Sequence, residues 1–332
     1  MKKTVLSLAL ALGLAMPALA ASQVEIELQG NFEGSAKSPS GEVMPLAAQI
    51  VALGSGKHVA KILVGDAKVE IEGRSRGKIE DGIIDYSGTI DLGNDLGGEY
   101  AITATVQNKV FSGEAKSAEG VHTFSLNRVQ KPSPTLGQAP PEGAVVLMDG
   151  TSMDAWVVKP LWQLIGDGAM GMRRGSITTK EEFGSAHYHV EFKTPLMPRE
   201  EPGSQGRGNS GVYVMGRYEV QVLDSFTDEV KDNRCGGIYQ KAVPRVNASL
   251  PPEEWQTYDI TMRAPEFDAS GNKTKDAVIT VVHNGITIHD NVVLPSATPG
   301  GVSGEETAKG VLMLQDHGDD VNYRNVWVNP LD

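Results

Sequence analysis

Two short segments far apart in the chain carry polar side chains in the alternating pattern of a β-strand. Glu219 and Gln221 alternate with valines in YEVQV, and Gln315 and His317 alternate in the same way in LQDH. Successive side chains of a strand point to opposite faces, so each pair is expected to share a face. If the two strands are neighbours, a carboxylate, an imidazole and two amides lie on one surface. A neutral imidazole beside a carboxylate can transfer protons near neutral pH.

The segment that leads into the first strand has glycines in the G-x-G-x-x-G spacing of a dinucleotide-binding loop, at Gly206, Gly208 and Gly211. That loop needs a strand before the glycines and a helix after them, because the helix N-terminus holds the pyrophosphate. Here a loop precedes the glycines, and residues 212–223 are expected to form one strand. The context therefore excludes a nucleotide site. A serine-hydrolase elbow is excluded too, because Val212 stands where it needs a glycine.

A solvated strand face is the alternative interpretation of both polar pairs. A third candidate group, His187, His189 and Glu191, also shares one face of an expected strand. Its H-x-H spacing can hold a metal ion, and a structural role is the alternative. A bound divalent cation is compatible with this spacing, but the sequence contains no complete ligand set that would predict one.

The first twenty residues have the features of a secretory signal peptide. Lys2 and Lys3 precede an apolar run, and an A-x-A-type cleavage site ends at Ala20. The run is too short to span a bilayer, and no cysteine follows the site, so we expect a periplasmic or secreted protein. Removal of the two lysines changes the formal net charge from −12 to −14, which disfavours nucleic acid as a partner. Cys235 is the only cysteine, so no internal disulfide can form.

The remaining chain divides into two strand-rich domains joined by a linker. Residues 21–130 predict a small all-β domain without a catalytic constellation, 131–142 a proline-rich linker, and 143–332 a second all-β domain. In the first domain, strands are expected at 23–28, 46–53, 83–90, 100–106 and 121–126. In the second, they are expected at 186–193, 212–223, 258–263, 277–283, 286–289, 310–314 and 323–328. This pattern indicates two packed antiparallel sheets, with a closed barrel as the alternative.

Several runs of the second domain resemble the 3-keto-disaccharide hydrolase family. They are VVLMDGTSMDAW, GNSGVYVMGRYEVQVLDS, CGGIYQKAVPRVNASLPPEEWQTYDI, VVHNGITIHDNV and GVLMLQDHGDDVNYRNVWVNPL. The resemblance covers about residues 143–332, and the runs follow one another in the family's order. It implies a concanavalin A-like jelly-roll β-sandwich and an exported enzyme that acts on carbohydrate. The N-terminal domain resembles nothing that suggests a function.

The resemblance also implies a substrate class, glycosides already oxidised to a ketone at C3 of one ring. A carbonyl at C3 acidifies the proton on C2, so a base can remove it and leave an enolate. The enolate expels the group at C1, and addition of water completes a net hydrolysis. Such a route needs a base, a group that stabilises the enolate oxygen, and an acid for the leaving group.

A set of polar residues in the matching runs is expected to supply these groups. His317 or Glu219 is expected to act as the base, and Arg324 or a bound metal ion to stabilise the enolate. The other candidates are expected to bind the sugar and to line the same site: Glu191, Asn209, Gln221, Tyr239 and Gln315.

Two alternatives to this chemistry stay open at the level of sequence. One is a plain two-carboxylate glycosidase that uses Glu219 and Asp224. These residues are five apart, so a regular strand places them on opposite faces unless a β-bulge lies between them. The other is a carbohydrate-binding or structural protein without catalytic activity. The expected partner of the enzyme is a carbohydrate substrate, with no nucleic acid and no membrane span, and the oligomeric state is not determined.

Overall fold

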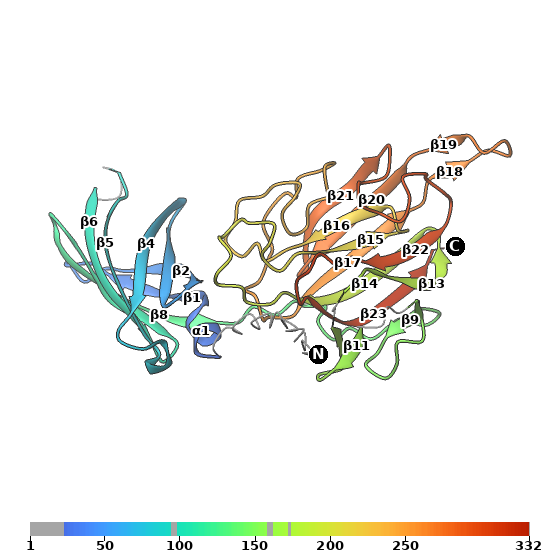
Figure 1. The fold of residues 1–332 in the computed structure, drawn as a ribbon. Helices are drawn as coiled ribbons and strands as arrows, with labels where there is room; N and C mark the ends of the chain where they lie inside the picture. Colours follow the sequence, from blue (N-terminus) through green and yellow to red (C-terminus); the bar gives the residue numbers. More distant parts are fainter. Residues whose placement is uncertain (1–22, 94–97, 158–161, 172–173, 332) are drawn as a thin grey trace, which may run out of the picture.

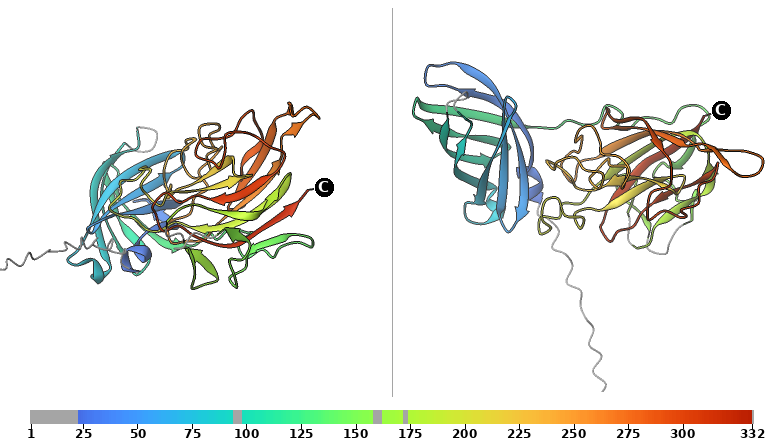
Figure 2. Two further views of the ribbon diagram at one scale, coloured as in Figure 1. Left: turned by 45° about the vertical axis from the view of Figure 1, so that its right-hand side comes forward. Right: turned by 90° about the horizontal axis from the view of Figure 1, so that it is seen from above.

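The computed structural model describes residues 23–331, except 94–97, 158–161 and 172–173. The expected signal peptide at 1–20 lies outside the described residues. The described chain forms two domains built almost entirely of strands, which lie side by side (Figure 1; Figure 2). The prediction of an all-β protein is therefore confirmed. No helix in the described part of the chain has the length and apolar character needed to cross a membrane.

The N-terminal domain is a closed antiparallel barrel in which each strand pairs with the next and the last pairs with the first. Its strands are β1 (Gly30–Lys37), β2 (Val43–Gly54), β3 (Lys57–Val64), β4 (Ala67–Ser75), β5 (Ile83–Asp91), β6 (Glu99–Gln107), β7 (Val110–Ser117) and β8 (Gly120–Val129). Buried and exposed residues alternate along these strands; on β6, for example, Tyr100, Ile102, Ala104 and Val106 point inward. Closure removes the exposed sheet edges that an open sheet of this size would have.

The expectation of a strand at residues 23–28 is wrong, because this segment is helix α1 (Gln23–Leu28). Its alternating apolar residues place Val24 and Leu28 four apart, and a helix brings such residues to one face. Leu28 belongs to the barrel core and Val24 packs against it. The alternating pattern of this segment is therefore compatible with a strand and with a helix, and packing of Val24 and Leu28 against the barrel favours the helix. A short 3-10 helix, η1 (Ile79–Asp81), contacts α1 from the connection between β4 and β5.

The C-terminal domain is a sandwich of two antiparallel sheets, as the strand pattern predicts. The five-stranded sheet has the order β10 (Trp156–Val157), β13 (Ile177–Phe183), β22 (Gly310–Leu314), β15 (Ser210–Val214), β16 (Tyr218–Val222). The eight-stranded sheet has the order β11 (Gln163–Ile165), β12 (Ala169–Gly171), β23 (Asn322–Pro330), β14 (Ala186–Lys193), β17 (Gln256–Arg263), β20 (Ala277–His283), β21 (Ile286–Leu294), with β9 (Val145–Met148) beside β23. A small ribbon of β18 (Glu266–Phe267) and β19 (Lys273–Lys275) extends from the sandwich.

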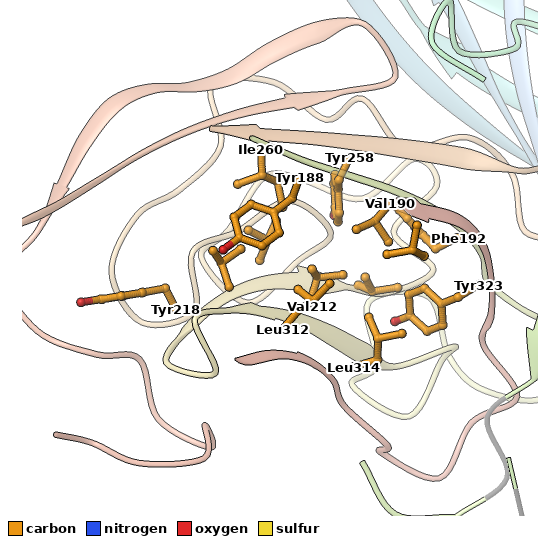
Figure 3. Close-up of a cluster of buried hydrophobic side chains, with 14 of the residues drawn as sticks. Tyr188, Val190, Phe192, Val212, Tyr218, Tyr258, Ile260, Leu312, Leu314 and Tyr323 are labelled. Carbon is orange, nitrogen blue, oxygen red and sulfur yellow. The ribbon is translucent and has the colours of Figure 1, made fainter. Parts of the chain in front are cut away.

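The sandwich core is formed by the facing sides of the two sheets (Figure 3). Val212 and Leu312 of the five-stranded sheet pack toward Tyr188, Tyr258 and Ile260 of the eight-stranded sheet. Because strand side chains alternate, the residues between these core positions lie on the two outer faces. The candidate site residues on strands all occupy such outward positions.

The expected single strand at 212–223 is in fact a hairpin of β15 and β16. Met215 and Gly216 both have positive φ, at 56° and 66°, and reverse the chain between the strands. The sequence does not indicate this turn, because Gly216 is the only residue of the segment that is common in turns. A second hairpin joins β20 and β21 at Asn284-Gly285, and both residues have the positive φ of a two-residue hairpin turn.

The linker lies along the outer face of the eight-stranded sheet. The Ser133 hydroxyl is 2.6 Å from that of Thr257, and the Thr135 hydroxyl donates to Asp259 at 2.7 Å. Between the domains themselves, Arg128 of the barrel forms a 2.9 Å ion pair with Glu254 of the sandwich. These contacts fix the linker and the barrel against the sandwich.

Candidate functional site

Glu219 lies on the outer face of the five-stranded sheet and is 2% exposed. Its neighbours on β16, Tyr218 and Val220, point into the core, so alternation turns Glu219 to the other side. The Tyr213 hydroxyl donates a 2.8 Å hydrogen bond to its Oε2. Burial raises the pKa of Glu219 to about 7, against the opposing effect of that hydrogen bond. A carboxyl with this pKa can accept or release a proton near neutral pH.

Tyr213 stands directly opposite Glu219 on β15 and holds the carboxylate in place. Its oxygen also lies 2.9 Å from the Pro299 carbonyl and accepts a 3.2 Å hydrogen bond from Nε2 of Gln315. Gly211, the next residue on this face, leaves room for the acid, because a Cβ there would lie 2.4 Å from Oε1 of Glu219. The hairpin strands β15 and β16 and the residue after β22 thus bring an acid, a phenol and an amide together. The expected pairing of two polar strands is not found, because β15 lies between β16 and β22, and Gln315 and His317 follow the end of β22.

Three amide side chains extend this polar face beyond Glu219. Gln221 donates to the side-chain oxygen of Gln205 at 3.4 Å, and Asn209 donates to the Gln205 carbonyl at 2.6 Å. Oδ1 of Asn209 and Oε1 of Gln221 are buried without a hydrogen-bond partner among the described residues. Buried polar atoms are usually hydrogen-bonded, so these two oxygens are acceptors suited to ligand hydroxyls.

A second carboxylate, Asp319, stands beside Asn209 in the loop that follows β22. Its Oδ2 accepts a 2.7 Å hydrogen bond from the Asn209 backbone amide. Burial raises the pKa of Asp319, and that hydrogen bond and the charge of a protonated His317 offset the increase only in part. His317 itself is exposed, and no hydrogen bond or ion pair joins it to Glu219 among the described residues. The loop therefore places His317 next to Asp319.

Tyr239 lies next to the acid and the phenol. Its backbone amide donates to the Glu219 carbonyl at 3.4 Å, and its side chain is half-buried. Burial, the charge and hydrogen bond of Glu219, and the charge of Tyr239 all raise the pKa of Tyr213. The structure thus brings six of the eight expected residues to one region: Glu219, Gln221, Gln315, His317, Asn209 and Tyr239.

Glu191 and Arg324 do not join this region, so the expectation that they line the same site is wrong. Both lie on the outer face of the eight-stranded sheet, on the opposite side of the sandwich. Arg324 donates to Glu191 at 2.8 Å, as do Asn325 at 2.9 Å and the Gly137 amide of the linker at 2.6 Å. Burial acts to raise the pKa of Glu191, but hydrogen bonds from His189, Asn325 and Arg324 outweigh it and lower the pKa to about 2.

His189 and Asp259 complete this second polar group. Nδ1 of His189 lies 2.7 Å from Asp259, and its ring stacks on Trp327. Burial acts to lower the pKa of His189, but its hydrogen bonds to Asp259 and Glu191 outweigh that effect and raise it. The side chains of this second polar group hydrogen-bond to one another or to the linker. Within the described parts of the chain, no three His, Cys, Asp or Glu side chains are arranged as a metal site.

Asp224, the second acid of the two-carboxylate alternative, is engaged in a buried ion pair. Arg207 donates to its Oδ2 at 2.7 Å, and both side chains are at most 3% exposed. Arg207 also reaches the Ala52 carbonyl of the barrel at 3.5 Å. Breaking a buried pair of this kind leaves an uncompensated charge, which gives Asp224 a structural role.

Comparison with known proteins identifies the family of the second domain. The 3-keto-alpha-glucoside-1,2-lyase-like domain matches residues 143–329, and the chain belongs to this family. A solved structure of an inferred glycosyl hydrolase from Parabacteroides distasonis ATCC 8503 is 32% identical, with a TM-score of 0.52, over 57% of this chain and 85% of that one. A second such protein from the same organism is 20% identical, with a TM-score of 0.42, over 58% and 99%. No protein of curated function matches the chain.

Sequence reasoning missed Tyr213, Gln205 and Asp319. Tyr213 was hidden inside an expected continuous strand, although its register opposite Glu219 follows once the turn at Gly216 is recognised. Asp319 follows His317 by two residues in a glycine-containing loop, where no periodicity predicts the direction of a side chain.

Proposed function

We propose that the sandwich domain is a carbohydrate-active enzyme that cleaves 3-keto-glycosides by elimination, with Glu219 as the base. The observation that carries this proposal is the buried Glu219 carboxyl, whose pKa is raised to about 7 on the polar face of a family member. A base with a pKa near the working pH combines an ionised fraction with useful proton affinity. The geometry favours Glu219 over His317, because His317 is exposed.

The chemistry of the substrate makes one base sufficient for the first step. The C3 ketone acidifies the C2 proton, which Glu219 removes as the enolate forms. The enolate then expels the C1 substituent, and water adds to the resulting double bond. The Tyr213 hydroxyl donates to Glu219 and accepts from Gln315, so it orients the carboxylate that acts as the base. In this account His317, which is exposed near Asp319, serves as the acid for the leaving group.

The amide group supplies the binding contacts in this account. Asn209 and Gln221 each present a buried oxygen without a partner among the described residues, and a sugar ring offers hydroxyl donors for both. A hydroxyl that satisfies such an oxygen removes the cost of burying it, about 1–3 kcal/mol.

The proposal is tested by incubating the protein with a 3-keto-disaccharide and, separately, with its unoxidised parent. We expect products from the keto sugar alone, because the parent lacks the carbonyl that acidifies C2. Products from both sugars would favour a two-carboxylate glycosidase, and saturable binding without product would favour a carbohydrate-binding protein.

We also propose that the protein is exported, on the basis of the signal-like first twenty residues. Mass spectrometry of the protein purified from the periplasm or the medium is expected to find an N-terminus at Ala21. A full-length protein confined to the cytoplasm would contradict this.

A further inference from the structure

The N-terminal barrel contains a cavity of about 540 Å³ at one end. It lies at the end where β1 joins β2, β3 joins β4, and β7 joins β8. Helix α1 packs at the other end, where it contacts η1 in the connection between β4 and β5. An eight-stranded barrel is just wide enough to be filled by its side chains or to hold one small ligand. Here the interior is incompletely filled, with a volume in the range of ligand pockets.

The walls of this cavity are mainly apolar. Inward-facing side chains from six strands line it: Leu46, Ile62, Ile90, Ile102, Ala115 and Phe124. Cavities lined in this way exclude water and accept apolar molecules, because water finds no hydrogen-bond partners there. Apolar side chains continue to the rim, where Met44 lines the cavity and is 36% exposed.

One polar atom in the wall has no partner. Nε2 of His122 is buried and makes no hydrogen bond among the described residues, while its ring packs edge-on against Tyr100. His122 lines the cavity near the mouth, at the beginning of β8. A buried nitrogen of this kind is costly unless a ligand completes its hydrogen bond. The remaining charged residues of the lining are acidic, Glu42 and Glu119, and both are exposed.

We propose that the barrel binds an uncharged single-chain amphiphile, with its chain in the cavity and its hydroxyl or amide head hydrogen-bonded to His122. The apolar walls favour the alkyl chain of the ligand, and Nε2 of His122 can hydrogen-bond one polar head group. Glu42 and Glu119 at the mouth disfavour a carboxylate head by charge repulsion. The proposal concerns a site separate from the polar face of the sandwich and does not depend on the proposed enzymatic activity.

The test uses the full-length protein and the neutral probe N-phenyl-1-naphthylamine, whose fluorescence increases in apolar surroundings. We expect saturable binding, displacement by 1-dodecanol, and displacement by dodecanoate that is at least tenfold weaker. Ala115→Phe places a ring in the cavity beside His122 and should weaken probe binding at least tenfold. Ala101→Phe is the matched control, because Ala101 is exposed on the outside of the barrel.

A second filling variant, Ala36→Phe, keeps the test decisive if the first does not fold. His122→Leu should weaken displacement by 1-dodecanol while leaving displacement by dodecane unchanged. The proposal is overturned if the wild-type protein shows no saturable signal, or if folded filling variants bind like the control. It is also overturned if dodecanoate displaces the probe as well as 1-dodecanol does, or if a disaccharide displaces it instead.

Discussion

At the level of single residues, the environment of Glu219 determines the chemistry of the proposed site. Alternation along β16 turns this acid away from the core, and Tyr213 across the hairpin donates a hydrogen bond to its carboxylate. Burial makes the ionised form costly, so the pKa rises. The same property that suits a base therefore reduces the stability of the folded protein at neutral and alkaline pH.

Glu219→Gln is expected to stabilise the protein at pH 8. The folded state holds the Glu219 proton more tightly than the unfolded chain does, because the pKa rises from 4.5 to about 7 on folding. The free energy of unfolding therefore decreases as the pH rises from 4.5 through 7, and glutamine removes this loss. We expect a gain of about 1–3 kcal/mol at pH 8 in urea denaturation, and little difference at pH 4. A variant less stable than wild type at pH 8 would show that the carboxylate is stabilised by its surroundings.

At the scale of elements, the hairpin of β15 and β16 positions the site. The strand pattern correctly predicted that Glu219 and Gln221 point to the same face, because side chains alternate along β16 whether or not a turn precedes it. It could not predict the partner strand, since the turn at Met215-Gly216 is hidden in an apolar run. The family resemblance placed Glu191 and Arg324 with Glu219, and a sequence does not show which of two sheets a strand joins.

Gly211→Ala tests how closely the hairpin holds the acid. The added Cβ would lie 2.4 Å from Oε1 of Glu219 and 3.0 Å from the Tyr213 ring, so the carboxylate must move. We expect kcat/KM on a 3-keto-glycoside to fall about 10–100-fold, since a displacement near 1 Å costs about this much. Gly206→Ala is the control, because its nearest neighbour would lie 3.3 Å away, on the Glu200 side chain. Equal activity in both variants would show that the close approach of Gly211 to Glu219 is not needed for catalysis.

At the scale of the whole molecule, the barrel and the sandwich are fixed together by a linker that is itself packed. Composition predicted the two domains and the all-β class, because proline content and strand periodicity are local properties. Closure of the barrel, its cavity and the position of the linker on the eight-stranded sheet depend on contacts between distant residues. These features could not be predicted from a single sequence.

The barrel is expected to lose stability in mild acid through His58. This side chain is 1% exposed, and burial lowers its pKa from 6.5 to about 4. The unfolded chain therefore takes up a proton first, and the free energy of unfolding falls as the pH drops from 6.5 to 4. Differential scanning calorimetry at pH 7 and pH 5 should show a smaller decrease in Tm for His58→Phe than for wild type, corresponding to about 1–2 kcal/mol. The same decrease in both proteins would assign the acid sensitivity to other groups.

Proton abstraction by Glu219 is tested by following, with NMR, the exchange of the C2 proton of a 3-keto-glycoside with deuterated solvent. We predict that the wild-type protein catalyses exchange or elimination at C2, with a rate that increases as the pH rises through about 7. Glu219→Gln should reduce this rate about 10²–10⁴-fold, whereas Glu182→Gln, at an exposed acid of the same sheet, should not. C2 exchange that continues at the wild-type rate in folded Glu219→Gln protein would contradict the account.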